Sequence, residues 1–138
     1  MAMKITLCYS MSYAEVAQQA KEWLDSHGHE AFVTDCNEAY LGLDEQQKEA
    51  LKLEHKYNHD AIRKHYDLIT DSDAILVLNH EKNGVPGYIG GNAFLEMGFA
   101  HVLGKKIYLL NPVPEMGYTT EIIAVKPVVL HGDLTRLL

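Results

Sequence analysis

Residues 73–79, DAILVLN, are the segment that decides the fold. Every residue from Ala74 to Leu78 is apolar, without the alternation that marks a strand with one face in water. An unalternated apolar run of this length indicates a strand that is buried on both faces, as in the middle of a parallel sheet. We therefore predict that residues 73–79 form the central strand of an α/β fold.

The segments on either side of this strand alternate between strand and helix patterns. Short apolar runs predict four further strands, at residues 4–9, 30–33, 106–111 and 127–131. Apolar spacing and capping residues predict helices at residues 13–27, 58–70, 91–103 and 119–124. Residues 44–55 are rich in helix-forming residues but are too polar to belong to the core.

This order of elements predicts a three-layer α/β fold: a doubly wound, five-stranded parallel sheet, flavodoxin-like or Rossmann-like, flanked by helices and built with right-handed crossovers. Ligands of such sheets bind beyond the carboxyl ends of the strands. The loops after Tyr9, Asn79 and Asn111 all follow predicted strands. We therefore expect these three loops to meet around a ligand.

The length and the charge of the chain limit its function. With 138 residues, 47% of them hydrophobic, residues 1–138 are expected to form a single domain with its own core. The 12 Lys and Arg residues are outnumbered by 19 Asp and Glu residues, which gives a net charge of -7. A nucleic-acid partner is therefore not expected, although backbone amides at the start of a helix can still hold a small anion.

Several common signals are absent from the sequence. Cys8 and Cys36 have no CxxC spacing, which argues against a disulfide framework or a zinc ribbon and favours a reducing, cytoplasmic location. No leader pattern occurs, and no apolar run approaches the ~20 residues of a membrane span, so no membrane association is expected. The GxGxxG and GxxxxGK[ST] motifs are also missing, and we expect no cofactor.

Residues 88–106, YIGGNAFLEMGFAHVLGKK, contain the strongest candidate for a functional carboxylate, Glu96. In a helix over residues 91–103, none of the residues three or four positions from Glu96 is a cation, and Leu95 and Met97 flank it. Such surroundings indicate a Glu that faces a cleft or the interior. The alternative is a first-turn Glu that only complements the helix dipole, which favours the ionised carboxylate.

The residues just before Glu96 are candidates for substrate binding. Gly90 and Gly91 allow the backbone to approach a ligand closely, and Asn92 can cap the first free amides of the helix. Tyr88 either forms a wall of the cleft or covers the core as a loop aromatic.

Two hydroxyl side chains, Ser10 and Ser12, follow the first predicted strand. Hydroxyls and free amides at the start of a helix form a plausible phosphate cradle, so both serines are candidates for substrate binding. Plain helix capping by either serine is the alternative.

Four histidines require separate interpretations. His55 and His59 stand at i,i+4 and could share a metal ion, but no third ligand is indicated. A solvated polar face is therefore favoured for this pair, and we expect no metal site. His65 faces either the ligand or water, with water favoured, and His101 is expected at the surface or in a subunit contact.

Three segments of the chain resemble, in order, the nucleoside 2-deoxyribosyltransferase superfamily, which includes the 2'-deoxynucleoside 5'-phosphate N-hydrolases. They are KITLCYSMSYAE at residues 4–15, HYDLITDSDAILVL at residues 65–78 and YIGGNAFLEMGFAHVLGKKIYLL at residues 88–110. The most specific element is the Glu-x-Gly-x-Ala run of residues 96–100, which Gly104 and Lys105 follow.

The resemblance implies N-glycosidic chemistry on a small nucleoside or nucleoside 5'-monophosphate. Glu96 matches the nucleophile that attacks C1' of a deoxyribose and carries the sugar as a covalent ester. His65, Tyr9 or a water is the candidate proton donor to the leaving base. The family cleft is usually completed by a neighbouring subunit, so a homo-oligomer, at least a dimer, is expected, and the loop after Asn111 is a candidate for that cover.

The chain departs from the family pattern at three positions. Tyr9 replaces a glycine of the first loop, His65 stands where the family often has an acidic residue, and Gly90 replaces an Asp common in the transferases. Two other functions stay open. One is a non-catalytic nucleotide-binding or sensor domain, in which Glu96 only hydrogen-bonds a ribose hydroxyl. The other is a flavodoxin-like redox or interaction module, which the first loop disfavours.

Overall fold

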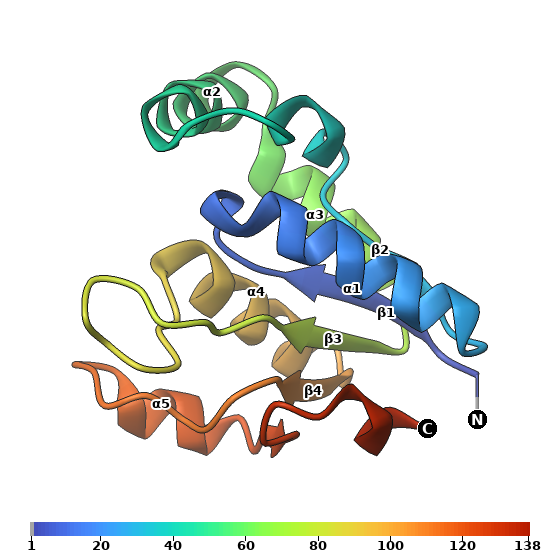
Figure 1. Ribbon diagram of the computed structural model, residues 1–138. Helices are drawn as coiled ribbons and strands as arrows, with labels where there is room; N and C mark the ends of the chain where they lie inside the picture. The colour runs from blue at the N-terminus through green and yellow to red at the C-terminus, as the bar shows by residue number, and fades with distance from the viewer. Residues whose placement is uncertain (1) are drawn as a thin grey trace.

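Five parallel strands form one sheet, in the spatial order β2-β1-β3-β4-β5 (Figure 1). The computed structural model describes residues 2–138. The strands are β1 (Lys4–Cys8), β2 (Glu30–Phe32), β3 (Ala74–Val77), β4 (Lys106–Leu109) and β5 (Val128–Val129). The helices are α1 (Ala14–Ser26), α2 (Glu45–Asn58), α3 (Ala61–Thr70), α4 (Gly91–Val102) and α5 (Thr119–Ala124), with 3-10 turns η1 (Met11–Tyr13), η2 (Asn37–Tyr40) and η3 (Leu134–Leu137). The predicted α/β fold with five parallel strands is confirmed.

Strand β3 lies at the centre of the sheet, between β1 and β4, and all of its residues are buried. Ile75 and Val77 pack into one hydrophobic core, and Leu76 packs into the other. Successive side chains of a strand point to opposite faces, so a strand covered on both sides needs apolar residues at every position. This burial explains the unalternated apolar pattern of residues 74–78.

Helices cover both faces of this sheet (Figure 1). One core joins the sheet to α1 and η3, through residues such as Leu24 and Leu137. The other joins it to α3, α4 and α5, through Ile69, Met97 and Ile122. Each large aliphatic side chain buried in this way contributes about 1.5–3 kcal/mol. Within residues 2–138, none of the helices combines the length and the apolar character that a membrane crossing requires.

The helix predicted over residues 58–70 begins later than expected, because Asn58 is the last residue of α2 and α3 starts at Ala61. The break occurs at Asp60, whose backbone has a φ of 46° and whose side chain accepts a hydrogen bond from the Arg63 amide at 3.3 Å. Asp tolerates the left-handed conformation and caps helix starts, so it can interrupt a polar segment that otherwise favours helix.

Helix α2 lies beyond the end of the sheet toward which the arrowheads of β1 and β3 point (Figure 1). A capping box between Asp44 and Gln47 starts this helix. Lys48, its buried residue, pairs with Glu15 of α1 and donates a hydrogen bond to the Ser12 carbonyl at 3.1 Å. These polar contacts hold α2 above the carboxyl ends of the strands, where ligands bind in parallel sheets.

Asn79 connects the loops that leave β3 and β4. Its side-chain amide donates to the carbonyl oxygens of Gly87, Asn111 and Pro112 at 3.3, 2.9 and 3.2 Å. Its side-chain oxygen accepts a hydrogen bond from the Asn111 backbone amide at 2.9 Å. Because Asn79 is only 1% exposed, it satisfies backbone groups that water does not reach.

We expect Asn79→Ala to lower the free energy of unfolding by roughly 2–4 kcal/mol, because the substitution leaves several loop carbonyl groups without a donor. Asn58→Ala, at an exposed residue at the end of α2, is the control and should change the same quantity by less than about 0.5 kcal/mol. Urea unfolding of both variants at one pH measures the difference. Equal stabilities of the two variants would contradict this role of Asn79.

Candidate functional site

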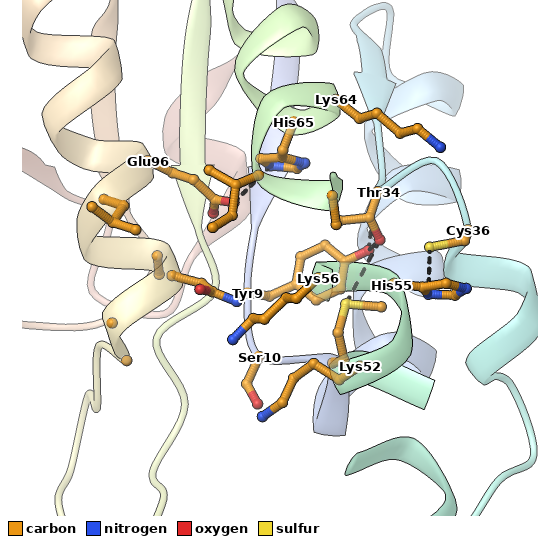
Figure 2. Close-up of a pocket in the computed structure, with 18 of the residues that line it drawn as sticks. Tyr9, Ser10, Thr34, Cys36, Lys52, His55, Lys56, Lys64, His65 and Glu96 are labelled. Carbon is orange, nitrogen blue, oxygen red and sulfur yellow. Dashed lines mark hydrogen bonds and ion pairs between the residues drawn. The ribbon is translucent and has the colours of Figure 1, made fainter. Parts of the chain in front are cut away.

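A pocket of about 410 Å³ opens at the carboxyl ends of β1 and β2. Its walls come from the segments after these strands, from α2 and α3, from the loop after β3 and from the start of α4 (Figure 2). Pockets for small ligands typically measure about 300–1,000 Å³. The pocket therefore has the size and the position of a small-molecule site in a doubly wound fold.

All but one of the residues predicted for the site line this pocket, namely Tyr9, Ser10, His65, Tyr88, Gly90, Gly91, Asn92 and Glu96. The exception is Ser12, whose hydroxyl donates to the Glu45 carboxylate at 2.9 Å. Ser10 caps η1, since its hydroxyl accepts a hydrogen bond from the Ser12 amide at 3.4 Å. The capping interpretation therefore holds for Ser10, although this residue also faces the pocket.

Glu96 and His65 line one end of the pocket and lie beside Cys8, which is buried and does not line the pocket. His65 Nε2 lies 3.6 Å from Glu96 Oε2 and 3.7 Å from Cys8 Sγ. The three side chains come from α4, α3 and β1. Cys8 is fully buried and His65 is 3% exposed, whereas the Glu96 side chain keeps 13% of its surface exposed. Glu96 is therefore the most accessible of the three groups to a ligand.

Burial changes the acidity of all three groups. It raises the pKa of Glu96 from 4.5 to about 8, and the Cys8 thiol and the Lys56 ammonium offset only part of this shift. It lowers the pKa of His65 from 6.5 to about 4 and raises the pKa of the Cys8 thiol well above its ordinary value. At neutral pH the three groups are therefore mainly uncharged. Shifts of this size are typical of functional sites.

The expectation that His65 faces water is wrong. Ile69, one turn later on α3, packs into the core between the sheet and the helices. Residues four apart share a face of a helix, so the burial of Ile69 also turns His65 inward, toward β1 and α4. His65 instead lines the pocket, as in the alternative interpretation that it faces the ligand.

Two expectations for the start of α4 are also wrong: that Asn92 caps the helix, and that the helix dipole decides the charge of Glu96. Gly90 is the N-cap residue, and Asn92 lies inside the helix and provides no capping hydrogen bond. Glu96 lies beyond the first turn of α4, where the influence of the helix dipole is small. Burial therefore outweighs the dipole and favours the protonated carboxyl.

Tyr9 lines the pocket with its ring, but its hydroxyl has other partners. The hydroxyl donates to Asn37 Oδ1 at 2.6 Å and accepts a hydrogen bond from the Thr34 amide at 3.2 Å. Burial also raises the pKa of Tyr9 above its ordinary value. Tyr9 thus connects the end of β1 to the segment after β2 and is poorly suited to donate a proton.

Four lysines that the sequence analysis missed line the pocket: Lys52, Lys56, Lys64 and Lys82. Figure 2 shows the first two pointing from α2 into the pocket. Lys52 and Lys64 have carboxylate partners, but within residues 2–138 no carboxylate oxygen lies within 4.0 Å of the Lys56 or Lys82 ammonium group. Burial, and next the charge of Lys52, lowers the pKa of Lys56.

Two sequence signals could have revealed these lysines. Lys52 and Lys56 are four residues apart, which places them on one face of a helix. Lys82 belongs to the loop after Asn79, one of the loops expected at the ligand site, and donates to the Ser10 hydroxyl at 3.0 Å. Neither signal shows that α2 lies above the end of β1, so the cluster emerges only in the folded chain.

One of the three loops expected at the ligand site does not line the pocket. The loop after Asn111 packs against the loop after β3, and residues 34–36, which follow β2, take its place in the lining. The order of the strands explains this difference. Strand β2 lies beside β1, whereas β4 lies on the far side of β3.

His55 and His59 have separate partners. His55 Nδ1 lies 3.1 Å from Cys36 Sγ and 2.9 Å from the Tyr40 hydroxyl. His59 follows the last residue of α2, and its Nε2 lies 3.3 Å from Glu54 Oε1. The two rings pack edge to face with their centroids 5.7 Å apart, but the contacts of their ring nitrogens are with different side chains. His101 is exposed near the end of α4, as expected for a surface residue.

Comparisons of the chain with protein-family models, with curated proteins and with solved structures found no match. Its function is therefore inferred from the chemistry of the pocket and from the resemblance of its sequence motifs.

We expect Glu96→Gln to stabilise the folded chain relative to the wild type increasingly as the pH rises from 6.5 to about 8, with little further change up to pH 9. The pKa of Glu96 is about 8 when folded and 4.5 when unfolded, so its protonated form favours folding and this contribution is lost as the pH approaches 8. Gln has no proton to lose. The lowered pKa of His65 acts in the opposite direction, but only between about pH 4 and 6.5.

Calorimetric melting of the wild type and the variant across this pH range measures the effect. At pH 9 the variant should exceed the wild type by at least about 1 kcal/mol in unfolding free energy, with a smaller difference at pH 6.5. Glu115→Gln, at an exposed loop residue, is the control. A difference that does not change with pH would contradict the raised pKa.

Proposed function

We propose that this chain cleaves or transfers the N-glycosidic bond of a small nucleoside or nucleoside 5'-monophosphate, with Glu96 as the nucleophile. The observation that supports this most is the position of Glu96: a largely buried carboxyl group in a pocket that aromatic and apolar side chains also line, including Tyr88, Leu95 and Phe99. The sequence resemblance assigns the nucleophile to the same residue. A carboxylate on one face of the sugar is what cleavage by double displacement requires.

In the proposed reaction, Glu96 first loses its proton and then attacks C1' of the sugar. A bond forms between C1' and a Glu96 oxygen while the bond between C1' and the base nitrogen breaks. The electron pair of the broken bond stays with the base, which takes up a proton. Water then releases the free sugar in a hydrolase, or a second base accepts the sugar in a transferase.

His65 fits a positioning role beside Glu96 better than the role of proton donor. Its Nε2 faces the Glu96 carboxyl at 3.6 Å, and its lowered pKa keeps it neutral, so it can orient the Glu96 side chain while the proton that Glu96 loses passes to solvent. The Tyr9 hydroxyl is already bound to Asn37. We therefore assign protonation of the leaving base to a water molecule in the pocket.

The lysines favour a substrate with an anionic group. Lys82 lies 3.0 Å from the Ser10 hydroxyl, and Lys56 points into the same pocket without a carboxylate partner among the described residues. In a chain with a net charge of -7, this is a local excess of positive charge. Hydrogen bonds from ammonium groups to phosphate are charge-assisted and strong, so we propose that a 5'-phosphate binds beside η1.

A second function, non-catalytic binding of a nucleotide, is favoured by the raised pKa of Glu96. A carboxyl group that keeps its proton at pH 7 can donate a hydrogen bond to a ribose hydroxyl without attacking the sugar. Release of free base separates the two functions, because binding alone leaves the nucleotide intact. The homo-oligomer expected from the resemblance stays a prediction.

We expect Glu96→Gln to lower the rate of base release by at least about 1,000-fold, because the substitution keeps the shape of the side chain but removes the nucleophile. Chromatography of nucleosides and nucleoside monophosphates incubated with the protein detects the free base. For the wild type, kcat/KM should rise about tenfold per pH unit and level off near pH 8, as Glu96 ionises.

The exposed Glu115→Gln variant is the control and should keep wild-type activity. Binding of the intact nucleotide by both wild type and Glu96→Gln, without base release by either, would replace the enzymatic proposal with the binding function.

We expect Lys82→Met to remove a preference for 5'-monophosphates. In the wild type, kcat/KM for a monophosphate should exceed that for its nucleoside by tenfold or more, which corresponds to about 1.4 kcal/mol. The variant should lose most of this factor while kcat/KM for the nucleoside stays within about twofold. Lys106→Met, at an exposed lysine that begins β4 at the opposite end of the sheet, is the matched control. Equal losses for both substrates would contradict a phosphate site at Lys82.

A further inference from the structure

Glu96 and His65, at one end of the pocket, form a group of three potential metal ligands with the buried Cys8. One ligand atom each from Cys8, His65 and Glu96 lies within 4.8 Å of the other two. Among residues 2–138, these are the only three or more His, Cys, Asp or Glu side chains grouped in this way. We propose that the three side chains form a reversible binding site for a divalent metal ion of the Zn²⁺ type.

The geometry fits such an ion. Bonds of about 2.3 Å from zinc to sulfur and 2.0–2.1 Å to nitrogen or oxygen place neighbouring ligands of a tetrahedral site about 3.3–3.6 Å apart. The distances from His65 Nε2 to Cys8 Sγ and to Glu96 Oε2 are 3.7 and 3.6 Å. Small movements of the three side chains are therefore sufficient for all three ligand atoms to bind one ion. The partial exposure of Glu96 leaves a fourth position for water from the pocket.

The charges also fit. On binding, the Cys8 thiol and the Glu96 carboxyl release their protons to solvent, and His65 binds through Nε2 with its proton on Nδ1. A thiolate and a carboxylate neutralise the two charges of the ion, so the buried cluster carries no net charge. Thiolate, imidazole and carboxylate are all ligands that zinc accepts.

The surroundings favour a reversible site over a permanent one. Ligating histidines usually donate their second N–H group to a neighbouring acceptor, which strengthens metal binding. His65 Nδ1 makes no hydrogen bond of ordinary geometry to an acceptor among the described residues. Metal binding does not depend on the proposed N-glycosidic reaction. If Glu96 is the nucleophile, a bound ion occupies it and inhibits the reaction.

Titration of the reduced, full-length chain with Co²⁺ tests the site, because a thiolate ligand produces a charge-transfer absorption band. We expect one ion per chain and loss of the band when Zn²⁺ is added. Cys8→Ser should abolish the band. Glu96→Gln should retain the band but bind Co²⁺ at least about tenfold more weakly.

The matched control is Cys36→Ser, because Cys36 Sγ lies 3.1 Å from His55 Nδ1 in the other Cys–His pair of the chain. This variant should bind Co²⁺ like the wild type. A wild type without the band, a band that survives in Cys8→Ser, or a band lost in Cys36→Ser would overturn the proposal. If Cys8→Ser does not fold, the Glu96→Gln variant decides the question by itself. An affinity for Co²⁺ equal to that of the wild type would then overturn the proposal.

Discussion

The burial of β3 between two layers of helices is the constraint on which the rest of the structure depends. Because both faces of this strand are covered, its neighbours β1 and β4 must also face helices on each side. The backbone groups of Asn111, just after the end of the neighbouring strand, then need partners within the protein, and the Asn79 side chain supplies them. The same core that stabilises the sheet therefore also holds the loop after β3, which lines the pocket.

The core also determines the positions and the pKa values of reactive side chains in and beside the pocket. Ile69 anchors α3 on the sheet, and the same helix face carries His65 against Cys8 and Glu96. These groups lose most of their contact with water, which raises the pKa of Glu96 and lowers that of His65. Ionisation of Glu96 thus opposes folding, whereas the proposed nucleophile requires it. The two proposals differ in what would react with or bind the ionised Glu96: the sugar of a substrate or a metal ion.

The lysines that line the pocket come from other parts of the fold than the buried side chains of Cys8, His65 and Glu96. Lys56 and Lys82 come from a polar helix and a loop, outside the layers that form the core. The position of Lys56 depends on the contacts of α2 with α1 and η1, such as the pair between Lys48 and Glu15, whereas Lys82 donates a hydrogen bond to the Ser10 hydroxyl. Substitutions at these lysines are therefore expected to alter ligand preference with little effect on stability.

The sequence by itself determined the strands, most helices and the candidate carboxylate, because these depend on local patterns: the apolar run at residues 74–78 and the uncharged helical neighbours of Glu96. Only the tertiary structure decided that His65 is buried, that residues 34–36 line the pocket in place of the loop after Asn111, and that lysines surround it. Each of these features depends on which strands are neighbours and on how α2 packs above them. Contacts between segments far apart in the chain leave no local pattern, so they emerge only when the sheet is assembled.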